Sequence, residues 1–209
     1  MAKLLKHTAI TLFFSSLVWF SCKPVKLVKS EGDNIQIAIN DTANGENSVK
    51  QLIAPYKQEL EAEMNTVLAQ SEMAMTKAQP EGLLGNFVAD LVFEKAQEKY
   101  QPSDNKVPDF CLINNGGLRT ALPKGNITKG KVFELMPFEN EIVVVTLSGG
   151  KTEELFEYIA AYGGQPVSNI QMGIEEGEPK NVMIGNEKFD DDHIYKVVTS
   201  DYLANGGDK

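Results

Sequence analysis

Apolar residues recur every four positions after residue 48, and this period predicts a helix with one apolar stripe. The residues of the stripe are Leu52, Tyr56, Leu60 and Met64. Pro55 falls inside the pattern, so we expect it to kink the helix or delay its start, because proline lacks the N–H that a helix interior uses. Residues 81–100 predict a second, amphipathic helix that becomes charged at its end.

Further elements follow from capping residues and apolar runs. Residues 150–164 predict a helix that ends on its own glycines, and Thr128 is expected to cap a short one. The candidate strands are 66–76, 109–113, 140–149, 168–176, 180–185 and 193–204. Helices and strands mix without a regular βαβ repeat, so we predict a single α+β domain with a mixed sheet.

The first 21 residues have the pattern of an export signal. Two lysines precede an apolar run over 9–20, which is shorter than the roughly 20 apolar residues that span a bilayer. Ser21 then precedes Cys22, which resembles the lipidation site of bacterial lipoproteins. We therefore expect a lipoprotein signal peptide at 1–21 with lipidation of Cys22, and an ordinary cleaved signal is the alternative.

This interpretation of the N-terminus sets the expected organisation and location. Residues 22–47 would form a flexible tether, and 48–209 would form the folded domain. The protein would be exported to the bacterial cell envelope, lipid-anchored in the periplasm or at the outer membrane. With Cys22 lipidated, no intramolecular disulfide is expected, and Cys111 in its apolar run is predicted to be a core residue.

The charge of the chain limits its partners. There are 29 acidic and 20 basic residues, a net charge of −9, and loss of the signal lysines would make the chain more acidic still. A nucleic acid or an anionic membrane surface would require a basic face, so neither is expected as a partner, and contact with the membrane would be through the lipid only. One small anion in a local positive pocket remains compatible with this composition.

The sequence does not match the common catalytic motifs that parts of it resemble. Gly150–Thr152 resembles the end of a phosphate-binding loop, but Val145 stands where that loop requires glycine. No nucleophile and base form a pair, so we assign no catalytic residue. The acidic run 190–193 has a single histidine, and we expect a solvated turn rather than a metal site. The chain is therefore expected to hold no metal and no cofactor.

Arg119 is the only arginine of the chain, and it follows Asn114, Asn115, Gly116 and Gly117. The two glycines let the backbone approach a ligand closely, and a guanidinium binds phosphate or carboxylate bidentately. Two other loops carry aromatic and acidic side chains, namely Phe138, Tyr202 and Asp208.

These three loops have the residue types of a nucleotide site. Two rings can sandwich a base, a carboxylate can accept ribose hydroxyls, and the guanidinium can hold phosphate. The residues alone leave open whether this is a site or three ordinary turns.

The loops resemble, in order and spacing, the C-terminal, substrate-binding domain of the 5′-nucleotidase family. The motifs are NNGGLR, the block from GNITKG to VTLSG, the terminal YLANGGD, and a Gly-Asn-x-x-x-Asp helix start at Gly85, Asn86 and Asp90. The resemblance runs from about residue 48 to 209. It implies the fold of that domain and a set of substrate-binding residues: Asn114, Gly116, Gly117, Arg119, Phe138, Tyr202 and Asp208.

The resemblance also implies roles. The asparagine and arginine would contact the nucleotide, the two rings would stack on the base, and the aspartate would bind the ribose. Family members commonly carry a second phosphate-contacting arginine before Gly85, where this chain has Gln79, Pro80 and Glu81. We therefore expect weaker phosphate affinity or a less phosphorylated ligand.

Full-length family members also have a preceding metallophosphatase domain that holds two metal ions, and none of its motifs is found here. The chain stops right after Asp208, where family members continue, so we expect it to be truncated at its C-terminus.

Two functions follow, and whether this chain takes part in an enzyme stays open between them. It would be the nucleotide- or nucleoside-binding half of a split 5′-nucleotidase, a hydrolase of nucleotide catabolism, whose separately encoded metallophosphatase supplies divalent metals and the activated water. The alternative is a non-catalytic nucleotide-binding or scaffold lipoprotein.

Overall fold

The structure is a computed structural model that describes residues 47–208. The predicted signal peptide, Cys22 and the predicted tether up to residue 46 lie outside the described residues. The chain divides into two units, Met1–Asn47 and Ser48–Lys209. In the described part of the chain, no helix has the length and apolar character needed to cross a membrane.

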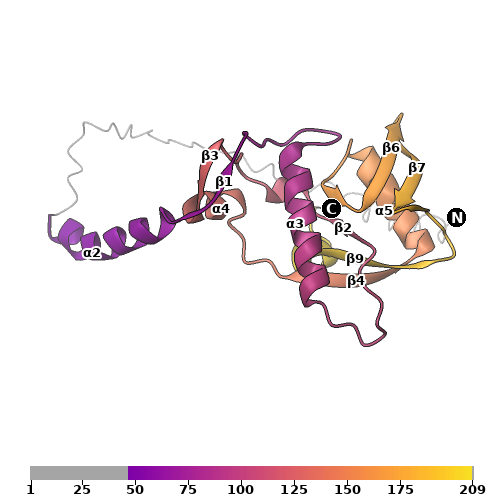
Figure 1. Cartoon of the computed structure of the whole chain (residues 1–209), viewed down its shortest axis with the longest axis horizontal. Coiled ribbons are helices and arrows are strands. Elements are labelled where there is room, and N and C mark those ends of the chain that lie inside the picture. Colours follow the sequence, from indigo (N-terminus) through magenta and orange to yellow (C-terminus); the bar gives the residue numbers. More distant parts are fainter. Residues whose placement is uncertain (1–46, 209) are drawn as a thin grey trace, which may run out of the picture. The chain divides into compact units, whose positions relative to one another are not determined.

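A mixed four-stranded sheet forms the centre of the second unit (Figure 1). Its strands in spatial order are β4 (Ile142–Ser148), β9 (Ile194–Ser200), β2 (Phe110–Leu112) and β5 (Val167–Ser168). β9 runs antiparallel to β4 and parallel to β2, and β5 is antiparallel to β2. Together with the helices, this mixed sheet confirms the predicted α+β fold.

Two helices cover the opposite faces of the sheet. Leu84 and Phe93 of α3 (Leu83–Lys99) belong to one buried cluster, whereas Phe156 and Ile159 of α5 (Gly149–Ala161) belong to another. Successive residues of a strand point to opposite faces, and β2 accordingly alternates between the two clusters. Phe110 and Leu112 join the α5 cluster, while Cys111 joins the α3 cluster. The sheet is thus the middle layer of three.

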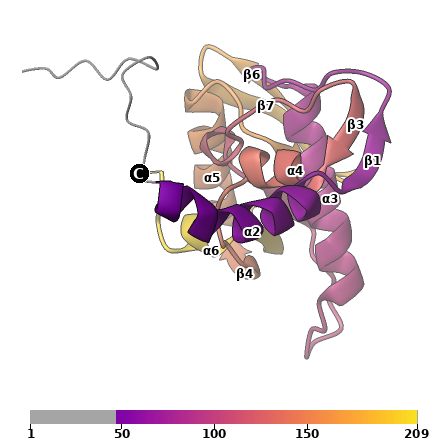
Figure 2. The ribbon, with the colours of Figure 1, turned by 90° about the vertical axis from the view of Figure 1, so that its left-hand side faces the viewer.

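Two smaller sheets flank this centre. β6 (Ile170–Glu175), β7 (Glu178–Ile184) and β8 (Glu187–Lys188) form an antiparallel sheet whose apolar residues join the α5 cluster. β1 (Val67–Ser71) pairs with β3 (Gly125–Thr128), and α4 (Lys129–Leu135) follows directly (Figure 2). The predicted cap of α4 is confirmed, because the Thr128 side chain accepts a hydrogen bond from the Lys131 backbone N–H.

The helix predicted after residue 48 is confirmed as α2 (Asn47–Met64), which includes Pro55, so proline does not delay its start. The stripe residues Leu52 and Tyr56 are exposed. Two strand predictions are corrected by the structure. The predicted strand 193–204 ends at Ser200, because the Ser200 hydroxyl accepts a hydrogen bond from the Leu203 N–H and starts the short helix α6 (Asp201–Ala204). Of the predicted strand 66–76, only β1 is a strand, apart from one bridge between Met75 and Leu122.

Candidate functional site

The NNGGLR loop leaves the buried end of β2 and turns at once. Asn115–Gly117 form one turn of 3₁₀ helix, and the Asn114 side chain lies over this turn. A Cβ atom on Gly117 would be 2.8 Å from Asn114 Oδ1, and one on Gly116 would be 3.2 Å from Asn114 Nδ2. Glycine at both positions therefore lets the amide of Asn114 approach the backbone of the turn.

The C-terminal loop is built in a similar way around a ring. After α6, Gly206 has a φ of 87° and Asp208 a φ of 61°, which turn the chain back across Tyr202. The N–H of Gly207 donates to the Tyr202 carbonyl at 2.9 Å, and a Cβ atom on Gly207 would be 2.3 Å from the tyrosine ring. The second glycine of NGGD thus makes room for the aromatic side chain.

Asp208 joins the two loops. One carboxylate oxygen accepts a hydrogen bond from the Asn114 amide, and the other accepts one from the Tyr202 hydroxyl at 3.0 Å. The Asp208 carbonyl accepts a further bond from the Tyr158 hydroxyl at 3.1 Å. Burial, followed by the neighbouring Tyr162 and Asp208, raises the pKa of Tyr158, so this phenol stays a donor at neutral pH. These bonds hold Asp208 beside a loop 94 residues earlier in the chain.

One pocket of about 210 Å³ lies between these loops and the segment after α4. Its lining contains all seven residues that the sequence predicted for substrate binding, together with Asn140. Phe138 and Tyr202 remain 49% and 45% exposed, so neither ring is buried in the hydrophobic core and both can contact a ligand. Asn140 was missed by sequence reasoning, although it is a polar residue only two positions after Phe138. The structure therefore gathers two rings, a carboxylate, amides and a guanidinium around one hollow.

Two backbone carbonyl groups position Arg119, one through its main chain and one through its guanidinium. Its N–H donates to the Leu135 carbonyl at 2.8 Å, and its Nη1 donates to the Gly116 carbonyl at 3.3 Å. The latter bond uses one of the five N–H donors of the guanidinium. The side chain is exposed, so its remaining donors can meet a ligand in the pocket.

The sequence and the fold of this chain are similar to those of known proteins. A sequence profile described as "5'-nucleotidase, C-terminal domain" matches residues 61–209. The chain belongs to the 5′-nucleotidase C-terminal domain family.

Relatives in this family are much longer than this chain. A 5′-nucleotidase of Vibrio parahaemolyticus is 26% identical over 210 residues, covering 92% of this chain and 35% of that protein. An apyrase of Tabanus yao is 28% identical over 170 residues, covering 69% of this chain and 30% of that protein. This chain thus spans about a third of the length of these relatives.

Solved structures show the same fold. The crystal structure of a 5′-nucleotidase precursor from Thermus thermophilus matches with a TM-score of 0.60 and 26% identity, covering 78% of this chain and 34% of that one. The NAD nucleotidase of Haemophilus influenzae matches with a TM-score of 0.53 and 21% identity, covering 77% and 33% of the two chains. The second likeness concerns the fold alone.

The side chains at the positions where the resemblance implied a second arginine do not line this pocket. The Gln79 side chain donates to the Tyr162 carbonyl at 3.0 Å, and Glu81 accepts a bond from Asn86. A different cation reaches the NNGGLR loop, because Lys77 Nζ donates to the Asn115 carbonyl at 3.2 Å. Sequence reasoning missed Lys77, since it considered only arginine at these positions.

Other candidate groups lie outside this pocket. Cys111 is fully buried, and burial raises the pKa of its thiol to about 12, which confirms the predicted core role. Asp190, Asp191 and Asp192 hold their carboxylates within 4.8 Å of one another in an exposed turn. This placement is compatible with the predicted solvated turn.

Proposed function

We propose that this chain is the nucleotide- or nucleoside-binding part of a two-chain 5′-nucleotidase, and that a separately encoded metallophosphatase completes the active site. The observation that carries the proposal is the pocket in which the NNGGLR loop, the segment of Phe138 and Asn140, and the YLANGGD loop meet. The matched part is about a third of a relative named 5′-nucleotidase.

Each group in the pocket suits one part of a nucleotide. Phe138 and Tyr202 present partly exposed rings, which can stack on a base. Asp208 already accepts two hydrogen bonds, and a carboxylate with about four lone-pair sites can still accept from ribose hydroxyls. Arg119 would bind phosphate, and the hydrolytic water and its metals would come from the partner.

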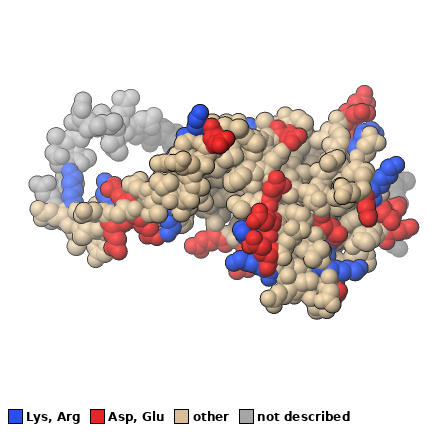
Figure 3. Space-filling view, viewed as in Figure 1, with Lys and Arg blue, Asp and Glu red and all other residues tan. Residues whose placement is uncertain are grey.

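The distribution of charge on the face drawn in Figure 3 does not favour a polymeric nucleic acid as the ligand. Figure 3 shows acidic and basic side chains intermixed along α3, where Lys95 lies within ion-pair distance of Glu94 and Glu98. Neutralised lysines of this kind give no basic stripe for a phosphate backbone. A mononucleotide in a small pocket is the ligand that fits this surface.

Calorimetric titration of the purified chain with adenosine and AMP tests the binding proposal. We expect both to bind, and Arg119→Lys to weaken AMP more than adenosine by about tenfold, because lysine lacks the planar bidentate fork. Lys180→Gln, which removes an exposed charge on β7, serves as the matched control and should change neither affinity. Equal weakening of both ligands by Arg119→Lys would show that the guanidinium does not bind phosphate.

The catalytic part of the proposal has a separate test. AMP with added divalent metal should release no phosphate when this chain is present alone, and release should appear when the metallophosphatase is supplied. A metal-dependent rate from the chain alone would contradict the proposal. AMP binding with no effect on any phosphatase would instead support the alternative of a non-catalytic binding or scaffold protein.

A further inference from the structure

A second hollow lies on the other side of the NNGGLR loop. It has a volume of about 440 Å³, against about 210 Å³ for the pocket described above. Asn114, Gly116 and Gly117 line the smaller pocket, whereas Asn115 lines the larger one, so the 3₁₀ turn separates the two. We call this hollow the α3–β6 groove, because α3 and the segment before it line one side and β6 lines another.

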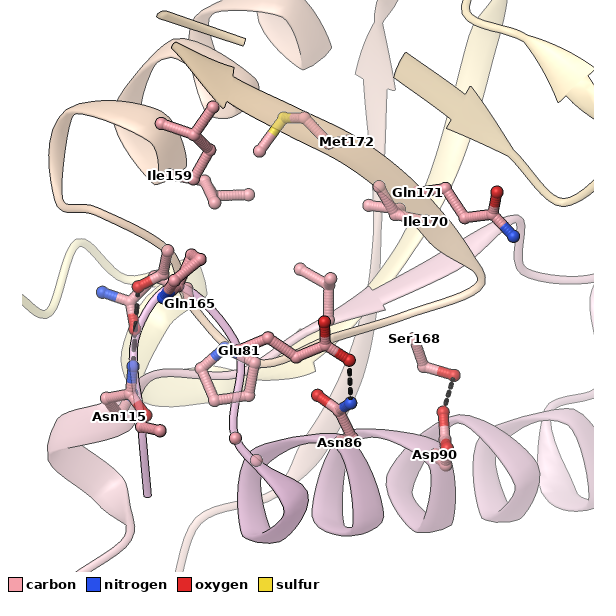
Figure 4. Close-up of a pocket in the computed structure, with 18 of the residues that line it drawn as sticks. Glu81, Asn86, Asp90, Asn115, Ile159, Gln165, Ser168, Ile170, Gln171 and Met172 are labelled. Atoms are coloured by element: carbon pink, nitrogen blue, oxygen red, sulfur yellow. Dashed lines mark hydrogen bonds between the residues drawn. The ribbon is translucent and has the colours of Figure 1, made fainter. Parts of the chain in front are cut away.

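The α3 side of the groove is rich in hydrogen-bond acceptors. In Figure 4, Asn86 and Asp90 project from the first turns of α3, and the Glu81 carboxylate, which comes from the segment before the helix, lies over Asn86. Asn86 donates to one oxygen of Glu81, and the Ser168 hydroxyl donates to one oxygen of Asp90 at 2.6 Å. These bonds use one of the two N–H donors of the Asn86 amide and the single donor of the Ser168 hydroxyl. Each carboxylate keeps a second oxygen, and Asn86 keeps its carbonyl oxygen, as acceptors.

The opposite side is aliphatic. Ile170, Met172 and Ile174 alternate along β6 and therefore share one face of the strand. All three line the groove together with Ile159 of α5, which lies beside Met172 in Figure 4. β6 is an edge strand, since it pairs with β7 on one side only. A ligand in the groove would touch carboxylates on one side and methyl and methylene groups on the other.

The lining excludes two common classes of ligand. It contains Glu81 and Asp90 and no lysine or arginine, so a phosphate or a carboxylate would meet only like charge. A divalent metal takes several converging carboxylates or imidazoles, whereas only two carboxylates line this groove. Among the described residues, the one group of three such ligands within 4.8 Å is the exposed turn Asp190–Asp192. An organic cation with an aliphatic body complements both the two carboxylates and the apolar side chains of the groove.

The spacing of the two carboxylates indicates the length of that cation. Asn86 and Asp90 are four residues apart on α3, which is roughly 6 Å along a helix axis. Glu81 is bonded to Asn86, so its carboxylate lies about one turn from that of Asp90. A chain of four methylenes places two ammonium groups at about this separation.

We propose that the α3–β6 groove binds an aliphatic diammonium ion of the polyamine class. One ammonium pairs with Asp90 and the other with Glu81, and the methylene chain packs on Ile170 and Met172. This site uses none of the residues of the nucleotide pocket, so it stands or falls independently of the function proposed above.

Titration of the purified full chain with 1,4-diaminobutane at pH 7 and low salt tests the class of ligand. Binding is expected at millimolar concentrations, and it should weaken as sodium chloride is added, because the carboxylates are exposed at the rim. Neutral 1,4-butanediol, which has the same length, and glucose should not bind. The proposal would be overturned if butanediol or glucose bound with the same affinity as the diamine, or if the diamine released no heat.

Substitutions test the residues. Asp90→Asn and Glu81→Gln should each weaken diamine binding about three- to fivefold, and together they should abolish it. Asparagine keeps an oxygen for the Ser168 hydroxyl, so the fold should be retained. Glu94→Gln on the same helix is the matched control and should leave binding unchanged. AMP affinity should not change in any of these variants, and unchanged diamine binding in the double variant would refute the assignment.

Discussion

Gly207 shows how one missing side chain shapes the candidate nucleotide pocket. A Cβ atom there would lie 2.3 Å from the Tyr202 ring, closer than two carbon atoms can approach. The Tyr202 hydroxyl in turn donates to the Asp208 carboxylate, and that carboxylate accepts a bond from Asn114. Any change at Gly207 that moves the ring should therefore also disturb the contact between the two loops.

Gly207→Ala tests this dependence. The added methyl should displace Tyr202, and loss of a stacking ring should weaken adenosine binding about three- to tenfold, measured by calorimetry. Gly150→Ala is the matched control, because a Cβ atom there meets nothing within 4 Å. If adenosine binds equally well to Gly207→Ala and to the control, Tyr202 does not stack on the base.

At the scale of elements, β9 is tied to the connection between α3 and β2 by one lysine. The Lys196 side chain is almost fully buried; it donates to the Asp104 carboxylate and to the Lys106 carbonyl. Its ammonium also lies 5.4 Å from the centre of the Tyr100 ring. The hydrogen bond from Lys196, followed by one from the Lys106 backbone, lowers the pKa of Asp104, and the same ion pair raises the pKa of Lys196.

These shifts predict how stability depends on pH. Because the folded pKa of Asp104 is depressed, its contribution is present above its unfolded pKa of about 3.9 and is lost as pH falls through the folded value. The Lys196 contribution is present below its unfolded pKa of about 10.4 and is lost as pH rises through its raised folded value. Urea unfolding of Asp104→Asn should show reduced stability at pH 7, with the difference from the original chain shrinking below pH 4.

Glu153→Gln on the exposed surface of α5 is the control for that measurement. It should match the original chain across the pH range. A constant deficit of Asp104→Asn from pH 7 down to pH 2 would mean that the pairing with Lys196 does not stabilise the fold.

At the scale of the whole folded unit, β2 connects two hydrophobic cores. Phe110 is fully buried against Phe156 of α5, while Cys111 is fully buried against α3 on the other face. The strand has only three residues, so a loss of packing on one face cannot be confined there. We therefore expect both cores to unfold in one transition.

Phe110→Ala should lower the free energy of unfolding by about 3–5 kcal/mol, as is typical for a large-to-small change at a buried site. In a Cys22→Ser background the only thiol is Cys111, whose raised pKa makes it unreactive in the folded state. Thiol labelling and circular dichroism should then report the same shifted urea midpoint. Val107→Ala, at a position 64% exposed, should shift it little. Separate midpoints for the two probes would show that the cores unfold independently.

Short-range patterns in the sequence determined most of the elements and the residue types of the site. The apolar period of α3, the Thr128 cap of α4 and the buried run of β2 each depend on residues within a few positions, so they could be predicted. Resemblance of three loops to a family supplied the seven pocket residues. Local patterns were insufficient at α6, where the Ser200 cap ended an apparently continuous strand.

Tertiary structure alone decided what those residues meet. The hydrogen bond between Asn114 and Asp208 spans 94 residues, and the contact of Lys77 with the Asn115 carbonyl spans 38. The α3–β6 groove likewise brings Asp90 opposite an edge strand about 80 residues later, a pairing that no local period encodes. Such contacts arise only when packing of the two cores brings distant segments together, because hydrophobic burial depends on the area covered and not on distance along the chain.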